Sequence, residues 1–400
     1  MALYKGVEVD DWLVNLIGRM GKVVEYQESL QSLQSVWDNL TLLGHLSGTG
    51  TDMSDTRSAF QQLTGSLLNQ LGRETLKKTA LEIKSKAQVA VDIMIRNLFE
   101  RTADIGFLAM DGEIKDYLLT RPSAEEHALK EADGRLLSRF REYVQKYSVY
   151  SNIILLDTEG NVLLQLARSG ALKQSQDPLV AESLATDAPY VETFRKTDLL
   201  PDAEKGLIYS YRVEREGKNL GVLCLCFRFE NETERIFSNL LDKNDWSVIT
   251  LLDGEGKVIA SSDPWHVPVG AALGHSPETD WSVIRFAGKE YLAATRATQG
   301  YQGYMGPGWY GHVMVPLEHA FEHESGKVLE NISQSAMEAV MGNQQLFGEA
   351  LREIPVQAGR IQRGLNRSVW NGNVSQCGDR NAMRLCENAM NLSTNDRLMR

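Results

Sequence analysis

The chain has 400 residues, 42% hydrophobic and 24% charged, values that are ordinary for globular proteins and exclude a collagen-like chain or one disordered throughout. Its 42 Lys and Arg against 53 Asp and Glu give a formal net charge of −11, and no local basic stripe is present, which argues against nucleic-acid binding. No run approaches the roughly 18 apolar residues of a membrane-spanning helix and the start lacks a signal-peptide pattern, so we expect a soluble, cytoplasmic protein with no membrane span.

The first 73 residues are expected to form an N-terminal helical region. All 10 prolines lie between Pro122 and Pro355, and because proline disrupts helix interiors, long helices are permitted before that point. Residues 44–55 predict a turn, with a helix cap at Ser54 or Asp55 and a second helical stretch after it. Before the turn, two rows of apolar residues at helical spacing predict a face suited to a partner helix: Leu16, Val23, Leu30 and Trp37, and Leu13, Met20, Tyr26, Leu33 and Leu40.

One long helix is predicted over residues 74–110. A helix of roughly 36 residues is ~54 Å long, which is more than one domain face needs. We therefore expect it to support a domain and to form a dimer seam. Its apolar stripe consists of Leu76, Ala80, Ile83, Ala87, Val91, Met94, Leu98 and Ile105.

After Pro122 the pattern changes to strands, and one hairpin occurs twice. Residues 154–165, ILLDTEGNVLLQ, are repeated almost position for position by residues 250–261, TLLDGEGKVIAS. Each copy is two β runs around an acidic, Gly-containing turn, which indicates a hairpin. Because self-similarity of this kind marks a repeated structural unit, we expect two copies of one small antiparallel α+β module, at about 111–235 and 236–318. A C-terminal helix over 319–373 and a disordered tail over 374–400 are expected to follow.

A long helix followed by two modules with this hairpin resembles the double-Cache (tandem PAS-like) sensor domain of bacterial chemoreceptors. The resemblance rests on residues 90–111, 153–165, 248–263 and 301–321. It is strongest to membrane-free Cache proteins linked to CheW-type chemotaxis output. The resemblance implies an α+β fold with long N-terminal helices, two tandem PAS-like antiparallel-sheet modules forming a double-Cache domain over 74–330, and a C-terminal helix.

The same resemblance implies a function and partners. The family binds a small molecule between a sheet and the loops over it, usually in the module farther from the termini, which is the first module here. It implies a homodimer through the long helices and CheW/CheA-type signalling partners. Two departures are present: most double-Cache domains lie outside the cell between two membrane helices, which this chain lacks, and the arginine, tryptophan, tyrosine and aspartate order of the amino-acid-sensing subset cannot be placed.

The candidate ligand contacts come from one strand and one loop of the first module. Alternate strand residues share a face, so Tyr209 and Tyr211 point one way and Ser210 and Arg212 the other. An aromatic wall with a few polar groups is what a small-molecule pocket needs. The alternative is that the tyrosines pack the sheet core and the charges face water. The loop over 178–198 adds polar and aromatic residues, so the predicted ligand-binding set is Tyr190, Arg195, Tyr209, Tyr211 and Asp187.

Other chemistry-bearing residues have simpler interpretations. Cys224 and Cys226 point the same way on a strand, and buried cysteines acting as small hydrophobes are favoured over a metal or redox pair. His319 and His323 have the i, i+4 spacing of a divalent-metal pair, but a solvated helix start is favoured. No nucleophile, base and orienting group can be placed together. We therefore expect no enzyme, no cofactor and no metal.

These observations predict a cytoplasmic sensory protein for signal transduction and chemotaxis. In this hypothesis a ligand in the first Cache module changes the packing of the long helices. The alternative is a ligand-free helical interaction scaffold that recruits chemotaxis or other signalling proteins, which is favoured by the apolar rows before residue 41 and by the missing amino-acid signature.

Overall fold

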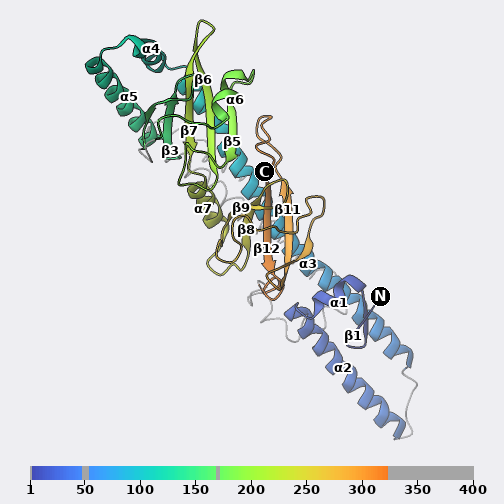
Figure 1. Cartoon of the computed structure of the whole chain (residues 1–400). Helices are drawn as coiled ribbons and strands as arrows, with labels where there is room; N and C mark the ends of the chain where they lie inside the picture. The colour runs from blue at the N-terminus through green and yellow to red at the C-terminus, as the bar shows by residue number, and fades with distance from the viewer. Residues whose placement is uncertain (1, 47–53, 168–171, 323–400) are drawn as a thin grey trace, which may run out of the picture. The chain divides into compact units, whose positions relative to one another are not determined.

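The computed structural model describes residues 2–46, 54–167 and 172–322, which fall into two compact units (Figure 1). Within the described residues, we call the first-module unit the one that holds 92–239 and 299–307, and the second-module unit the one that holds 2–91, 240–298 and 308–322. The N-terminal region therefore belongs to the same unit as the second sheet.

The N-terminal region is a small hairpin and two helices: β1 (Ala2–Tyr4), β2 (Val7–Val9), α1 (Asp11–Ile17) and α2 (Gly21–Leu46). The hairpin turns at Lys5 and Gly6, whose φ values of 47° and 83° suit a tight two-residue turn. Strands of three residues are too short to show an alternating pattern, so the sequence predicted only helix here. Asp10 holds the start of α1, because its backbone N–H donates to Asn69 at 2.8 Å and its carboxylate accepts from Arg73 at 3.0 Å.

The long helix, α3, runs without interruption from Ser54 to Ala109, a length of 56 residues. The two helical stretches that the sequence predicted on either side of residue 74 are thus one helix. Glycines inside it mark close approaches: a Cβ at Gly72 would lie 2.6 Å from Leu13 Cδ1, and one at Gly65 would lie 2.9 Å from the carbonyl oxygen of Glu8. The predicted apolar stripe is buried, including Ile83, Ala87 and Leu98.

The first module consists of a five-stranded antiparallel sheet in the order β4-β3-β7-β6-β5 with helices around it. Its elements are α4 (Gly112–Thr120), a 3₁₀ turn (Arg121–Ser123), α5 (Glu126–Lys146), β3 (Tyr150–Leu156), β4 (Val162–Gln165), α6 (Leu179–Ala185), β5 (Val191–Arg195), β6 (Gly206–Arg215), β7 (Lys218–Phe227) and α7 (Phe229–Leu240).

The second module has a five-stranded antiparallel sheet of the same topology, in the order β9-β8-β12-β11-β10. Its strands are β8 (Val248–Leu252), β9 (Val258–Ser261), β10 (Ser282–Phe286), β11 (Lys289–Ala297) and β12 (Tyr310–Pro316). Read along the chain, both sheets place the second strand at one edge and the third at the other. The predicted fold class, long N-terminal helices followed by two tandem PAS-like antiparallel-sheet modules, is confirmed for the described residues.

The duplicated turns have the same local geometry. Asp157 Oδ1 accepts the backbone N–H groups of Glu159 at 2.9 Å and Asn161 at 2.8 Å. Asp253 Oδ1 accepts those of Glu255 at 3.0 Å and Lys257 at 2.9 Å. These acids shape backbone turns, as the sequence predicted.

The C-terminal predictions fall mostly beyond the described part of the chain. Residues 319–322 form a turn. The rest of the predicted C-terminal helix to residue 373 and the predicted tail over 374–400 lie outside the described residues.

Candidate functional site

The first sheet has two faces with different neighbours. Tyr209 and Tyr211 point to the face that packs against α3, where a Cβ at Gly106 would lie 3.7 Å from Tyr211 Cε2. Ile208 and Ser210 point to the opposite face, which α6 covers. The alternation predicted from the sequence is therefore present. Within the 178–198 segment, α6 covers the Ser210 face, whereas Tyr190 and Glu192 lie on the tyrosine face.

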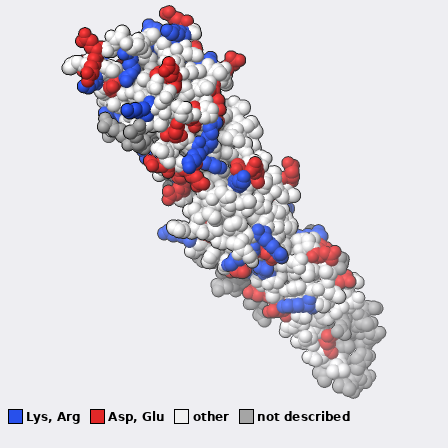
Figure 2. Space-filling model, in the orientation of Figure 1, with Lys and Arg blue, Asp and Glu red and all other residues white. Residues whose placement is uncertain are grey.

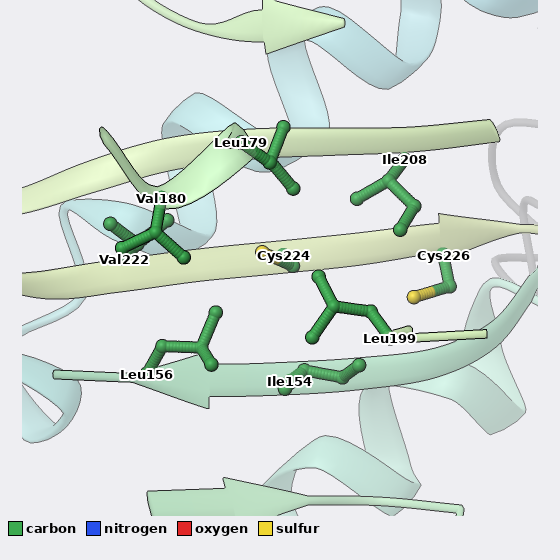
Figure 3. Packing of buried hydrophobic residues seen from close by; sticks show 9 residues of the cluster. All are labelled: Ile154, Leu156, Leu179, Val180, Leu199, Ile208, Val222, Cys224 and Cys226. Atoms are coloured by element: carbon green, nitrogen blue, oxygen red, sulfur yellow. The ribbon is translucent and has the colours of Figure 1, made fainter. Parts of the chain in front are cut away.

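Aliphatic side chains fill the middle of the α6-covered face. Leu179 and Val180 of α6 and Leu199 pack there against the sheet (Figure 3). Cys224 and Cys226 are fully buried in the same cluster, so both sulfur atoms form part of the apolar packing. Burial raises the pKa of the Cys226 thiol to about 12 and that of Cys224 well above its ordinary value, so both behave as small hydrophobes. Ile154, Leu156, Ile208 and Val222 complete the sheet side of the cluster.

A polar group lies at the edge of this face, where α6 meets β5 and β6. The hydroxyls of Ser183 on α6 and Ser210 on β6 are 2.7 Å apart and buried. Arg195 on β5 donates to Asp177 at 2.9 Å and to Glu182 at 3.2 Å, and its side chain is 38% exposed. We call these five residues the α6 edge cluster. It contains a cation, two acids and two hydroxyls that join α6 to the sheet.

Hydrogen bonds hold Asp177 and Arg195 in their ionised forms. Although burial alone would raise the pKa of Asp177, hydrogen bonds from Thr197, Arg195 and the Leu179 N–H hold it below its ordinary value. The hydrogen bond to Asp177 raises the pKa of Arg195 in turn. The guanidinium is thus already paired, and a ligand carboxylate or amine that enters here would compete with an internal ion pair.

A second polar group lies on the α3-facing side of the same sheet. Glu192 on β5 accepts hydrogen bonds from Tyr209 at 2.9 Å and from Tyr304 at 2.7 Å and 2.8 Å. Burial raises the pKa of Glu192, and the two tyrosine donors partly oppose that effect. The Tyr190 ring lies 6.4 Å from the Tyr209 ring. Glu192 therefore sits among aromatic side chains.

The structure places the five predicted ligand residues in three different surroundings. Tyr190 and Tyr209 lie together beside Glu192, and Tyr211 follows on the same face, against α3. Arg195 is on the opposite face, in the α6 edge cluster. Asp187 is exposed in the bend after α6. The three tyrosines share the side of the sheet that packs against α3. The role of the five residues in ligand binding stays a prediction.

Several residues of these groups could not be found from the sequence. Ser183 and Asp177 have no motif around them, and they reach the sheet only because α6 folds over it. Tyr304 comes from residues 299–307, between β11 and β12, yet it reaches Glu192 on β5 within the first-module unit. An aromatic-rich segment was visible over 301–310, but nothing local in it points to this carboxylate.

The predicted histidine pair is only partly described. The His319 ring stacks on Trp246, with centroids 4.0 Å apart and planes 10° apart, and its Nδ1 lies 2.8 Å from Glu322. His323 lies outside the described residues. Over the described ranges, no group of three or more His, Cys, Asp or Glu side chains is arranged to hold a metal ion.

The surface charge and the helices bear on two questions, whether a strongly charged patch is present and whether a segment could span a membrane. Figure 2 shows acidic and basic side chains interspersed over the viewed face. None of the helices within the described residues is both long enough and apolar enough to cross a membrane.

Comparisons with known proteins find sensor domains. No family profile matches the chain, and no curated protein matches it. Among solved structures, the sensor domain of the V. cholerae histidine kinase DctB is 15% identical with a TM-score of 0.46, over 59% of this chain and 96% of that one. The ligand-binding domain of the Campylobacter jejuni chemoreceptor Tlp3, in complex with 4-methylisoleucine, is 16% identical with a TM-score of 0.42, over 64% and 95%.

A third similar structure is the ligand-binding domain of the Pseudomonas fluorescens chemoreceptor CtaA, in complex with L-leucine. It is 15% identical with a TM-score of 0.41, over 61% of this chain and 97% of that one. These three structures are the sensor domain of a histidine kinase and the ligand-binding domains of two chemoreceptors.

Proposed function

We propose that this chain is a sensory signal-transduction protein that binds a small molecule in its first module, without catalysing a reaction. The binding site is the α6 edge cluster, and the response is a shift in how α3 packs. The observation that carries the proposal is the junction of α6 with β5 and β6, where the 38% exposed Arg195 bonds to Asp177 and Glu182 and where the buried hydroxyls of Ser183 and Ser210 join α6 to β6. Small-molecule sites typically have a small number of convergent polar groups beside an apolar surface.

The cluster offers more than one way to hold a ligand. Arg195 recognises a carboxylate or phosphate, while Asp177 and Glu182 recognise an amine. A ligand that replaces the Arg195 ion pairs releases α6 from β5, because those bonds join the two elements. The same ligand gains the hydrogen bonds of Ser183 and Ser210 only if α6 moves to separate the two hydroxyls. Binding is therefore coupled to the position of α6.

The relay to α3 passes through β6. Ser210 on the ligand side is next to Tyr209 and Tyr211, which face α3 on the other side. A change in the strand alters the surface on which α3 packs, and a ligand with different affinity for the two arrangements shifts their populations. We propose further that the protein acts in the cytoplasm as a homodimer through its long helices, with CheW/CheA-type proteins as chemotaxis output.

A thermal-shift screen with organic acids, amines, purines and amino acids tests the sensing function. We expect one compound class to raise the melting temperature of the wild type and to lose that effect in Arg195→Ala and Ser210→Ala. Arg215→Ala is the matched control, because Arg215 lies on β6, the strand next to β5, and, like Arg195, is paired with an acid, Asp116, at 2.7 Å. It should respond like the wild type. Loss of the response in all three variants alike would contradict the site.

Hydrogen exchange tests the relay separately. The ligand found in the screen should change amide exchange in residues 76–105 of α3. Unchanged exchange there, with exchange slowed in α6, would leave binding intact and overturn the relay.

The aliphatic packing of the α6-covered face favours a second candidate function. Leu179, Val180 and Leu199 already fill the middle of that face, which suits a module that holds no ligand. The chain would then be a helical interaction scaffold that recruits chemotaxis or other signalling proteins. A flat thermal-shift profile together with a helical partner recovered by the full chain supports this function over sensing.

A further inference from the structure

A row of polar side chains crosses the middle of the second sheet. Thr250 on β8, His312 on β12 and Thr295 on β11 are directly paired across adjacent strands and therefore share a face. Their exposed fractions are 0%, 0% and 2%. Polar groups buried this deeply in a sheet are normally satisfied by hydrogen bonds. Each hydrogen-bond donor and acceptor in this row is therefore expected to have a partner.

The bonds of Thr295 indicate which tautomer His312 adopts. Thr295 Oγ1 lies 2.9 Å from His312 Nδ1 and accepts the backbone N–H of Ser276 at 3.4 Å. The threonine hydroxyl has a single hydrogen, and among the described residues His312 Nδ1 is the one acceptor within hydrogen-bond distance of it, so a satisfied Thr295 hydroxyl donates to Nδ1. His312 then carries its own hydrogen on Nε2. Burial, aided by nearby His275, lowers the pKa of His312 to about 3, so the ring is neutral.

The Nε2 atom of His312 is buried and has no hydrogen-bond partner among the described residues. The equivalent row of the first sheet differs. There Ile154, Cys224 and Ser210 are the paired residues, and Ser210 is satisfied by Ser183. In the first sheet, the polar side chain of the central row is therefore hydrogen-bonded to another side chain of the module. In the second sheet, the Nε2–H group of His312 has no acceptor among the described residues.

Apolar groups surround this donor on both sides of the row. Leu252 and Tyr310 flank it on one side, and the segment between β9 and β10 covers the face with Val267 and Leu273. Val248, Ala293 and Met314 flank the other side. The His275 ring, from the covering segment, lies 6.0 Å from the Tyr310 ring. Nothing in the row is acidic or positively charged.

These surroundings define the chemistry of a ligand. A neutral N–H donor requires an oxygen or nitrogen acceptor. A carboxylate is disfavoured, because burying an anion beside an uncharged donor leaves its charge uncompensated. An uncharged carbonyl group on a short alkyl chain fits both the donor and the apolar sides.

We propose that the second module contains a second small-molecule site, in which His312 Nε2 donates to the carbonyl oxygen of a short uncharged amide or ketone. Its alkyl part lies among the aliphatic side chains beside the row, under the segment between β9 and β10. This site is separate from the α6 edge cluster proposed above, and either can exist without the other.

Imidazole NMR on the wild-type full chain tests the proposal directly. The protein is labelled at its 7 histidines, and the His312 signals are assigned by their absence in His312→Gln. The probes are propionamide, 2-butanone and, as the charged counterpart of the amide, propionate. We expect propionamide or butanone to shift the His312 Nε2 signal saturably, and propionate to leave it unchanged. No shift with either uncharged probe, or a shift with propionate alone, overturns the proposal.

Variants separate this site from the first-module site. His312→Phe keeps a ring and removes the donor, and we expect binding at least about tenfold weaker, the loss of one hydrogen bond. His312→Gln restores an amide donor near the Nε2 position and should recover part of the affinity. Arg195→Ala should leave propionamide binding unchanged. Equal affinity in His312→Phe and the wild type overturns the proposal, whatever the outcome of the screen on the first module.

Discussion

Tyr304 bonds to Glu192 through both carboxylate oxygens, at 2.7 Å and 2.8 Å, although the two residues are 112 positions apart. Tyr209 donates to the same carboxylate at 2.9 Å. Among the described residues, the hydrogen bonds to this carboxylate come from two phenol hydroxyls and from no cation. The arrangement tolerates a protonated or an ionised Glu192, and the choice between them depends on pH.

Stability of the first-module unit is expected to fall as Glu192 ionises. Burial raises the folded-state pKa of Glu192 above its ordinary value of 4.5. A raised folded-state pKa means that the favourable contribution is complete below about pH 4.5 and is lost as pH rises through the folded-state value. Glu192→Gln removes this ionisation while its carbonyl oxygen still accepts from both tyrosines. Urea unfolding between pH 4.5 and 8 should therefore show a shallower loss of stability in Glu192→Gln.

The control for this titration is Glu126→Gln, which changes an exposed acid on α5. It should reproduce the pH profile of the wild type. A profile in Glu192→Gln as steep as that of the wild type would show that Glu192 does not titrate in this range.

The duplicated turn acids provide a paired test of the two modules. Asp157 and Asp253 each accept two backbone N–H groups, so replacement by Ala should cost about 1–3 kcal/mol. Asn keeps the Oδ1 acceptor and should cost much less. Hydrogen exchange should speed up locally, in β3 and β4 for Asp157→Ala and in β8 and β9 for Asp253→Ala. Equal effects of Ala and Asn would contradict a role in accepting these bonds.

These turns were also the part of the fold most open to prediction. The repeat of residues 154–165 at 250–261 is local, and each copy contains its own strands, turn acid and left-handed glycine, Gly160 or Gly256. The stripe of α3 is equally local, since apolar residues at helical spacing record a buried face directly. The presence of two modules and of the long helix could therefore be predicted from residues that are close together in the sequence.

The site contacts depend on long-range placement instead. Alternation predicted which β6 residues share a face, but it could not tell which face α3 would occupy and which α6 would cover. Ser183 meets Ser210, and Tyr304 meets Glu192, only through the folded topology. Likewise, a lone His312 in a strand has no pattern that reveals its unmet Nε2. Sequence reasoning therefore named Tyr209 and Arg195 as one site, while the structure separates them.

Gly311 on β12 is predicted to be intolerant of a side chain. A Cβ there would lie 2.0 Å from the carbonyl oxygen of Ala87 on α3, which is far inside van der Waals contact. Gly311→Ala should destabilise the second-module unit by about 1–3 kcal/mol or more, because helix and strand must separate. Gly254→Ala is the matched control, since a Cβ there meets nothing within 4 Å, and it should change stability by less than about 0.5 kcal/mol. Comparable denaturant midpoints for the two variants would contradict the close approach.

Lys86 on α3 and Asp245 form a buried ion pair in the second-module unit. Lys86 Nζ lies 2.6 Å from Asp245 and 2.8 Å from Glu82, and the Lys86 and Asp245 side chains are each 7% exposed. Lys86→Met should destabilise by about 3–5 kcal/mol at neutral pH, because it leaves a buried carboxylate without its cation. Lys130→Met removes an exposed partner of Glu126 and should cost less than about 1 kcal/mol.

The double variant Lys86→Met, Asp245→Leu distinguishes the charge effect from lost packing. It removes both ions and should recover most of the stability lost in Lys86→Met, since an apolar pair of similar volume often replaces a buried ion pair without cost. Although burial alone would raise the pKa of Asp245, the charge and hydrogen bond of Lys86 hold it below its ordinary value of 3.8. The contribution of Asp245 is therefore present above about pH 3.8 and lost as pH falls through the folded-state value. Acid unfolding of the double variant should lack that loss. If the double variant is as unstable as Lys86→Met at pH 7, lost packing and not the unpaired charge accounts for the effect.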